Sequence, residues 1–191
     1  DGENKTVDEV RERLGVVPES TGLYSRLTAW ENIRYHTRIH GRNDEKSWDR
    51  TNRFAKALDI EDELHRPTRG FSRGMRQKIA LIRAIAHGPD LLLLDEPTAG
   101  LDVTSARKVR ELVRQLGDDG GTVIYSTHML SEAQRICDRI IILHNGTVRA
   151  DGSPSELLED TSSEDLEDAY ISLTRDVARS EPIEKESTIS N

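Results

Sequence analysis

The sequence lacks several features, and each absence narrows the class of protein. Its 191 residues include one cysteine, Cys137, which excludes a disulfide framework and fits a reducing compartment. No apolar run approaches the ~20 residues of a membrane-spanning helix, and no signal peptide is visible. Acidic residues outnumber basic ones by 35 to 27, so a broad basic face for nucleic acid is not expected. The length allows one domain with a real core and a smaller appendage.

The most informative stretch that is present is residues 91–102, Leu-Leu-Leu-Leu-Asp-Glu-Pro-Thr-Ala-Gly-Leu-Asp. The four leucines predict a central strand covered on both faces, and Pro97 stops the strand's hydrogen-bond ladder directly after the acids. Asp95 and Glu96 then lie at the carboxyl end, where parallel sheets bind ligands. Because strand alternation sends neighbours to opposite faces, the two acids are expected to serve Mg²⁺ and an attacking water separately. A strand that runs into an acidic turn is the alternative.

A second candidate site precedes this stretch. Ser72 is a natural N-cap for a helix that continues through residues 78–87, and its free backbone N–H groups, the hydroxyl and Gly74 would suit an anion. An ordinary serine cap without a ligand is the alternative. The position of this helix, directly before a buried strand that ends in Asp-Glu, favours the anion site.

The remaining pattern alternates helices and strands. Capping boxes at Thr6 and Thr28 predict helix starts, and Asn145-Gly146 predicts a hairpin turn. Trp30 and Trp48 are expected to anchor the core. Further strands are predicted over residues 14–17, 122–127, 139–143 and 147–150. Further helices are predicted over residues 44–58, 104–116 and 131–137, the last capped by Ser131, and two more helices begin near residues 153 and 166.

His128 and the pair of His36 and His40 are histidines whose positions suggest a function. His128 stands at the carboxyl end of the strand over residues 122–127, where an imidazole can contact a phosphate, although a satisfied loop histidine is the alternative. His36 and His40 lie one helical turn apart and can in principle share a metal. No third ligand is apparent from the sequence, so a solvated helix face is the favoured interpretation.

Three motifs in this order resemble the nucleotide-binding subunit of an ABC transporter. They are Ser-Arg-Gly-Met-Arg-Gln at residues 72–77, the stretch over residues 91–102, and Ser-Thr-His at residues 126–128, and the resemblance covers about residues 14–152. The resemblance implies an α/β fold: a P-loop NTPase-like ABC ATPase core with a mostly parallel sheet, plus an α-helical subdomain. It also implies the cofactors ATP and Mg²⁺. By motif position, the resemblance implies that Asp95 binds Mg²⁺, Glu96 is the catalytic carboxylate and His128 contacts the γ-phosphate. It implies that Ser72, Arg73, Gly74 and Met75 form the signature loop. Asp102 would make a dimer contact, and Glu19 occupies the Q-loop position.

The sequence departs from the family pattern at three places. Phe71, Arg73 and Met75 replace three of the five usual signature residues Leu-Ser-Gly-Gly-Gln, and a Ser-Xaa-Gly-Met form is similar to the export-type branch. Glu19 cannot donate a hydrogen bond as glutamine does, although its carboxylate can reach Mg²⁺ through water. None of the 13 glycines is followed by lysine, so the phosphate loop is absent. We therefore expect an N-terminally truncated fragment that lacks the first strands and the Walker A loop, and that is inactive as it stands.

The resemblance divides the chain into five segments: residues 1–27, a remnant of the ATP-binding core with the Q-loop region; 28–87, a helical subdomain that ends in the signature helix; 88–152, a RecA-like core; 153–177, C-terminal helices; and 178–191, a disordered tail. The expected whole is a head-to-tail homodimer that hydrolyses ATP at two composite sites and drives a transmembrane permease subunit. It would lie at the cytoplasmic face of the membrane, touch the membrane only through the permease, and bind no nucleic acid.

The helix over residues 166–174 resembles the C-terminal end of export-type subunits, such as those for multidrug, sodium or polysaccharide export. A soluble ABC-type ATPase of translation or DNA repair is the alternative, but neither a second cassette nor a long heptad insertion is present. A non-catalytic interaction fragment is a further alternative, since the phosphate loop is absent.

Overall fold

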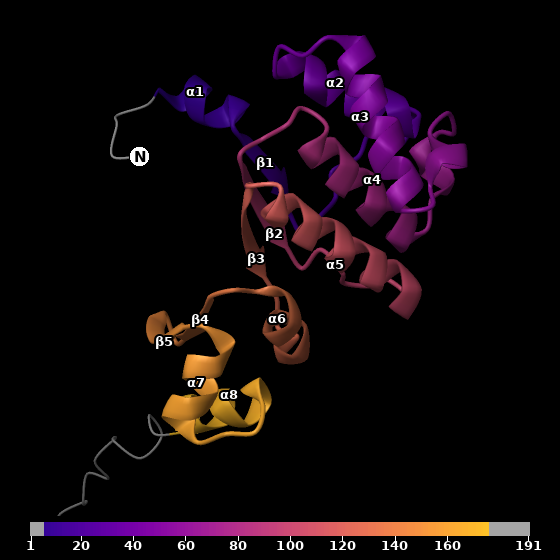
Figure 1. The fold of residues 1–191 in the computed structure, drawn as a ribbon. Coiled ribbons are helices and arrows are strands. Elements are labelled where there is room, and N and C mark those ends of the chain that lie inside the picture. Colours follow the sequence, from indigo (N-terminus) through magenta and orange to yellow (C-terminus); the bar gives the residue numbers. More distant parts are fainter. Residues whose placement is uncertain (1–5, 176–191) are drawn as a thin grey trace, which may run out of the picture. The chain divides into compact units, whose positions relative to one another are not determined.

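The computed structural model describes residues 6–175 of the chain (Figure 1). The chain divides after His128 into two compact units, which are described separately. The first unit contains a sheet and most of the helices, and the second contains a hairpin with three helices. The five-segment division predicted from the sequence stays a prediction.

The first unit is built on a parallel sheet of three strands, β1 (Leu14–Val17), β2 (Leu91–Asp95) and β3 (Thr122–Ser126). Their order is β1-β2-β3, and both neighbouring pairs run parallel. In the register, Val17 lies beside Leu94 and Asp95 lies beside Ser126. The predicted α/β fold with a mostly parallel sheet is therefore confirmed.

The prediction that β2 is covered on both faces is wrong. Leu92 and Leu94 are buried in the main core, together with side chains of helices α4 (Arg73–Ile85) and α5 (Val103–Asp118). Leu93 is only half-buried, and its cross-strand partners Val16 and Ile124 are 43% and 55% exposed. Strand alternation places these three side chains on the opposite face of the sheet. Among the described residues, helices therefore bury one face of the sheet and leave the other partly open.

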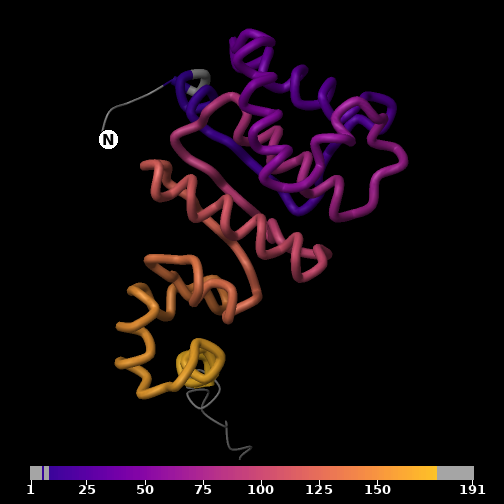
Figure 2. Tube along the Cα trace, turned by 45° about the vertical axis from the view of Figure 1, so that its right-hand side comes forward, coloured from indigo at the N-terminus to yellow at the C-terminus, as the bar shows by residue number. Residues whose placement is uncertain are grey.

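The first unit contains three further helices besides α4 and α5. They are α1 (Val7–Glu12), whose described residues are exposed, α2 (Ala29–Ile39) and α3 (Asp44–Ala57), with short 3-10 turns at Glu61–Glu63 and Thr68–Gly70. Capping boxes form at Thr6 and Thr28 as predicted. Helices α2, α3 and α4 lie side by side in both views (Figures 1 and 2). Trp30 and Trp48 lie half-buried against the core, with their rings edge to face and 5.0 Å apart.

The packing of α2 against α4 also corrects the interpretation of the histidines. His87, which follows α4, lies beside His36 and His40, so the pair on α2 has a third histidine next to it. The sequence could not show this, because His87 is distant in the chain and reaches the pair only when α2 packs on α4.

The second unit comprises α6 (Leu130–Ile136), the antiparallel hairpin of β4 (Ile140–His144) and β5 (Thr147–Gly152), α7 (Pro154–Thr161) and α8 (Leu166–Arg175). Asn145 and Gly146 have φ angles of 48° and 73°, which the predicted two-residue turn requires. The predicted cap at Ser131 is wrong, because α6 begins at Leu130 and Ser131 already lies in its first turn. The predicted disordered tail lies outside the described residues. Within residues 6–175, every helix is too short or too polar to cross a bilayer.

Candidate functional site

The three parallel strands of the first unit end at one edge of the sheet. Asp95 is the last residue of β2, Glu19 follows β1 by two residues, and His128 follows β3 by two residues. Because both strand pairs are parallel, these residues lie along the same carboxyl-terminal edge. Ligands of open α/β sheets bind at this edge. The positions predicted for Asp95 and His128, at the carboxyl ends of their strands, are confirmed.

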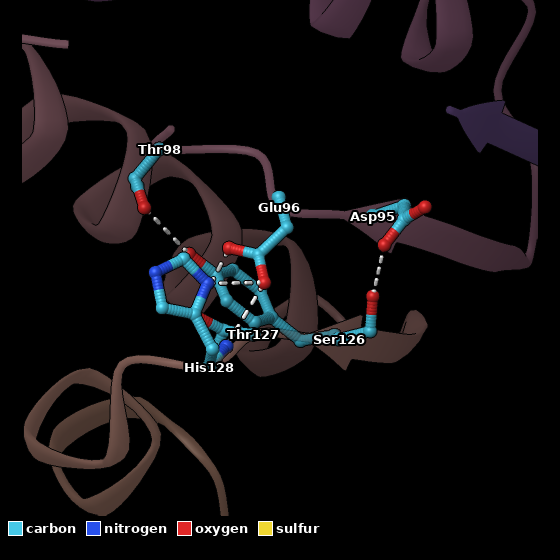
Figure 3. A network of polar contacts seen from close by, with 7 residues as sticks. Asp95, Glu96, Thr98, Ser126, Thr127 and His128 are labelled. Atoms are coloured by element: carbon cyan, nitrogen blue, oxygen red, sulfur yellow. Dashed lines mark hydrogen bonds and ion pairs between the residues drawn. The ribbon is translucent and has the colours of Figure 1, made fainter. Parts of the chain in front are cut away.

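Asp95 contacts the neighbouring strand. The hydroxyl of Ser126, its cross-strand partner, donates a hydrogen bond of 2.5 Å to Asp95 Oδ1 (Figure 3). The aspartate side chain is otherwise exposed, so a cation from solvent can reach the carboxylate. The sequence reasoning missed Ser126. Ser126 belongs to the Ser-Thr-His segment at a predicted strand, and this was a signal that the sequence offered. The strand register that pairs Ser126 with Asp95 cannot be read from the sequence.

Glu96 turns away from Asp95 for a different reason than the one predicted. The strand ends at Asp95, and Glu96 adopts a φ of 45°, in the left-handed region that non-glycine residues rarely occupy. Its backbone N–H donates to the carbonyl oxygen of Ser126 at 3.0 Å, which fixes this turn. The two acids have separate partners within the chain, and a left-handed turn separates them rather than the predicted strand alternation. That they serve Mg²⁺ and an attacking water stays a prediction. Such strained residues cluster at functional sites.

His128 is the partner of Glu96 (Figure 3). Both its backbone N–H, at 2.9 Å, and its ring Nδ1, at 2.8 Å, contact Glu96 Oε1. Thr127 Oγ1 donates to the other carboxylate oxygen at 3.4 Å. Because a carboxylate only accepts, the ring contact requires the proton on Nδ1 and leaves the Nε2 lone pair free in the neutral ring. The Glu96 side chain is 21% exposed and the His128 side chain 79%, so the pair presents an oriented imidazole to solvent.

The predicted anion site begins α4. Ser72 is its N-cap as predicted, and Ser72 Oγ accepts a hydrogen bond of 3.1 Å from the backbone N–H of Met75. The start of α4 also contacts the loop that follows the two acids. A Cβ atom on Gly100 would lie 2.7 Å from the Arg73 side chain, and one on Gly74 would lie 3.2 Å from Leu101. The signature segment and residues 100–101 therefore pack together within one chain, which no sequence pattern had indicated.

Glu19 and Asp102 are the two remaining residues that the sequence analysis assigned to the site. A pocket of about 380 Å³ is lined by Glu19, Ser20, Thr21, Arg73, Arg76 and Gln77. It brings the segment after β1 together with the first turn of α4, and it places two arginines opposite one glutamate. Asp102 is the N-cap of α5, where its side chain accepts from the backbone N–H of Ser105 at 2.9 Å. Hydrogen bonds from Ser105 lower the pKa of Asp102, so the cap is ionised at neutral pH.

Comparisons with known proteins agree with this geometry. Residues 1–99 match the family described as ABC transporter. The chain is 42% identical over 165 residues to "ABC transporter ATP-binding protein NatA" of Bacillus subtilis, which covers 86% of this chain and 67% of NatA. It is 31% identical over 162 residues to "Nod factor export ATP-binding protein I" of Cupriavidus metallidurans, covering 85% of this chain and 54% of that protein.

A solved structure agrees with the sequence comparisons. The structure titled "Structure of ATP binding subunit of ABC transporter" superposes with a TM-score of 0.81 at 30% identity, over 87% of this chain and 70% of that one. The family match spans half of the sequence, and the fold, the motif order and the relatives all agree. The chain belongs to the ATP-binding subunits of the ABC transporter family.

Proposed function

We propose that this chain carries the Mg²⁺-binding and water-activating groups of an ATP-driven export transporter. The observation that carries the proposal is the divergence of the two acids at the end of β2: Asp95 contacts Ser126, and Glu96 contacts His128. Phosphoryl transfer uses one group to hold the metal and another to orient the nucleophile.

The oxygen groups at the sheet edge fit the metal. Mg²⁺ prefers carboxylate and water oxygens, and the exposed carboxylate of Asp95 beside the Ser126 hydroxyl offers such ligands. When bound, the ion would neutralise charge on the β- and γ-phosphates. Glu96 would accept the proton of the attacking water or orient that water. Its contact with His128 would hold the imidazole in place, and a His128 that is protonated on both ring nitrogens could donate from Nε2 to a phosphate oxygen.

A second copy of the chain completes the proposed site. In a head-to-tail homodimer, Ser72, Arg73, Gly74 and Met75 at the start of α4 would close over ATP that is bound by the partner. Exposed Ser72 and Arg73, together with the N–H groups of the first turn of α4, support this role because a helix N-terminus attracts phosphate. Exposed Asp102 would lie at the dimer interface, and Glu19 in the arginine-lined pocket would reach Mg²⁺ through water.

The proposed partner in the membrane is a transmembrane permease subunit, bound at its cytoplasmic face. One of the relatives reported above is named as an export protein, and both are named as ATP-binding proteins. Exposed apolar side chains gather on and near α2, where Tyr24 and Tyr35 pack edge to face at 5.7 Å and Ile39 lies exposed on the same helix as Tyr35. An exposed apolar patch of this kind is a candidate contact for another protein. The patch therefore supports a contact with the permease; export, and the expectation of no direct membrane or nucleic-acid binding, are part of the proposal.

The test separates metal binding from water activation in the product of the complete reading frame that encodes this chain. Asp95→Asn should weaken MgATP binding, because the amide loses the charge that holds the cation. Glu96→Gln should leave binding unchanged and lower hydrolysis by about 10²–10⁴-fold, the usual contribution of a general base. Binding is measured by calorimetry and hydrolysis by phosphate release. If Asp95→Asn binds MgATP normally, or if Glu96→Gln hydrolyses it normally, the assignment is wrong.

A further inference from the structure

Three histidines of the first unit converge away from the site described above. His36 and His40 lie on the last turn of α2 and at its C-cap, and His87 lies between α4 and β2. One ring nitrogen from each lies within 4.8 Å of the other two. The rings of His40 and His87 are stacked at 4.1 Å, and that of His36 lies 4.6 Å from His40.

Within residues 6–175, no group donates a hydrogen bond to the second ring nitrogen of His87. The residue is 2% exposed, and its Nε2 lies 3.2 Å from the carbonyl oxygen of Leu14. A carbonyl only accepts, so the Nε2 carries the proton and Nδ1 presents a lone pair. That Nδ1 is buried without a hydrogen-bond partner, and so is Nδ1 of His36. Metal-binding histidines commonly donate one ring N–H to a carbonyl and direct the other nitrogen at the ion.

The surroundings keep these rings in the neutral form that binds metals. Burial, with a smaller contribution from the neighbouring histidines, lowers the pKa of His87 to about 3. Burial, followed by His40 and Arg83, lowers the pKa of His36 to about 4. Burial and then Arg42 lower the pKa of His40, and the carboxylate of Glu12 partly offsets this by raising the pKa. The arginines oppose a cation, whereas Glu12 is a nearby negative charge that favours one.

We propose that His36, His40 and His87 bind one zinc ion, with a water molecule as the fourth ligand. Three imidazoles are an established donor set for tetrahedral Zn²⁺ at Zn–N distances of ~2.0–2.1 Å, which correspond to about 3.3 Å between ligand nitrogens. The ligand nitrogens must therefore approach one another by up to about 1.5 Å from their present separation of up to 4.8 Å. His40 lies half-buried at the end of its helix, where it can make this adjustment.

This site is separate from the ATP chemistry. His87 precedes the first residue of β2, and Asp95 is the last residue of that strand, so the strand itself places about 13 Å between the two ends. Bound zinc would connect α2 to the segment between α4 and β2. The expected consequence is a more stable first unit, because an ion that binds only the folded state adds to its stability.

The test titrates ZnCl₂ into the untagged chain by calorimetry in metal-free buffer, with Co²⁺ absorption as a report of tetrahedral geometry. We expect one ion per chain and a higher thermal midpoint with zinc than with a chelator. His40→Ala and His87→Ala should each weaken binding by more than about tenfold, since even loss of an outer-shell partner costs 10–100-fold. His65→Ala is the matched control, because His65 lies against Trp48 outside the cluster.

Two results, one for the wild-type chain and one for His40→Ala, would overturn the proposal directly. One is the absence of saturable zinc binding by the wild-type chain, and the other is unchanged affinity in His40→Ala. If His87→Ala fails to fold because that residue is buried, His40→Ala still decides the question, since its side chain is partly exposed. Loss of binding in His65→Ala would also contradict the assignment.

Discussion

Gly100 offers the sharpest test of how the start of α4 meets the loop after the two acids. Its φ is +74°, and an added Cβ would lie 2.7 Å from both Cδ and Nε of Arg73. Gly100→Ala therefore has two separate costs, the left-handed backbone and the displacement of Arg73. Gly41 is a matched control, because its φ is +68° and nothing lies within 4 Å of an added Cβ.

The difference between the two variants isolates the contact with Arg73. A left-handed backbone costs an alanine about 1–2 kcal/mol, and reduced freedom of the unfolded chain returns ~0.4–1 kcal/mol. Both terms apply equally to Gly41→Ala and Gly100→Ala. Forcing Arg73 from its rotamer adds about 0.5–1.5 kcal/mol to Gly100→Ala alone. In an Arg73→Ala background, Gly100→Ala should cost no more than Gly41→Ala.

Urea unfolding followed by tryptophan fluorescence measures these costs. Trp30 and Trp48 are the two tryptophans of the chain, and both belong to the first unit, so the signal reports that unit. A chelator in the buffer keeps metal binding out of the comparison. If Gly100→Ala and Gly41→Ala are equally destabilised, or if the Arg73→Ala background leaves the Gly100→Ala cost unchanged, the described packing is wrong.

Three further predictions concern single groups. Asn32→Leu should destabilise the first unit by about 1–3 kcal/mol in the same unfolding assay, because buried Asn32 accepts from the Tyr24 N–H at 2.8 Å and leucine leaves that donor unpaired; unchanged stability would refute this. His128→Ala should change stability by less than about 0.5 kcal/mol, since the side chain is 79% exposed, yet lower hydrolysis by the complete reading-frame product about 10²-fold; wild-type turnover would remove His128 from the mechanism. The 191-residue chain should bind MgATP more weakly than about 1 mM (~4 kcal/mol), because no Gly-Lys-Ser/Thr loop is present, and micromolar binding in calorimetry would contradict this.

Local chemistry made much of the fold predictable. The capping boxes at Thr6 and Thr28 each use residues within one helical turn, and both form. The hairpin at Asn145-Gly146 likewise depends on the φ angles of two adjacent residues. The same holds for Ser72, which caps α4 through a bond to Met75. Interactions between residues that lie within a few positions of one another can be read directly from the sequence.

What the sequence could not provide were relations between distant segments. The contact of Ser126 with Asp95 depends on strand register, and the position of His87 beside His36 depends on how α2 packs against α4. The half-open face at Leu93 depends on which helices cover the sheet. The left-handed turn at Glu96 gives no sign in the sequence either, because residues other than glycine rarely adopt this conformation.

The central claim is that Glu96 activates water while the nucleotide is held between two copies of the subunit. The most direct measurement is the molar mass of the Glu96→Gln product of the complete reading frame, by light scattering with and without MgATP. We predict a monomer without nucleotide and a stable dimer with MgATP, because the variant binds ATP without hydrolysing it. A monomer under both conditions, or a dimer that dissociates as ATP is hydrolysed at the wild-type rate, would contradict the account.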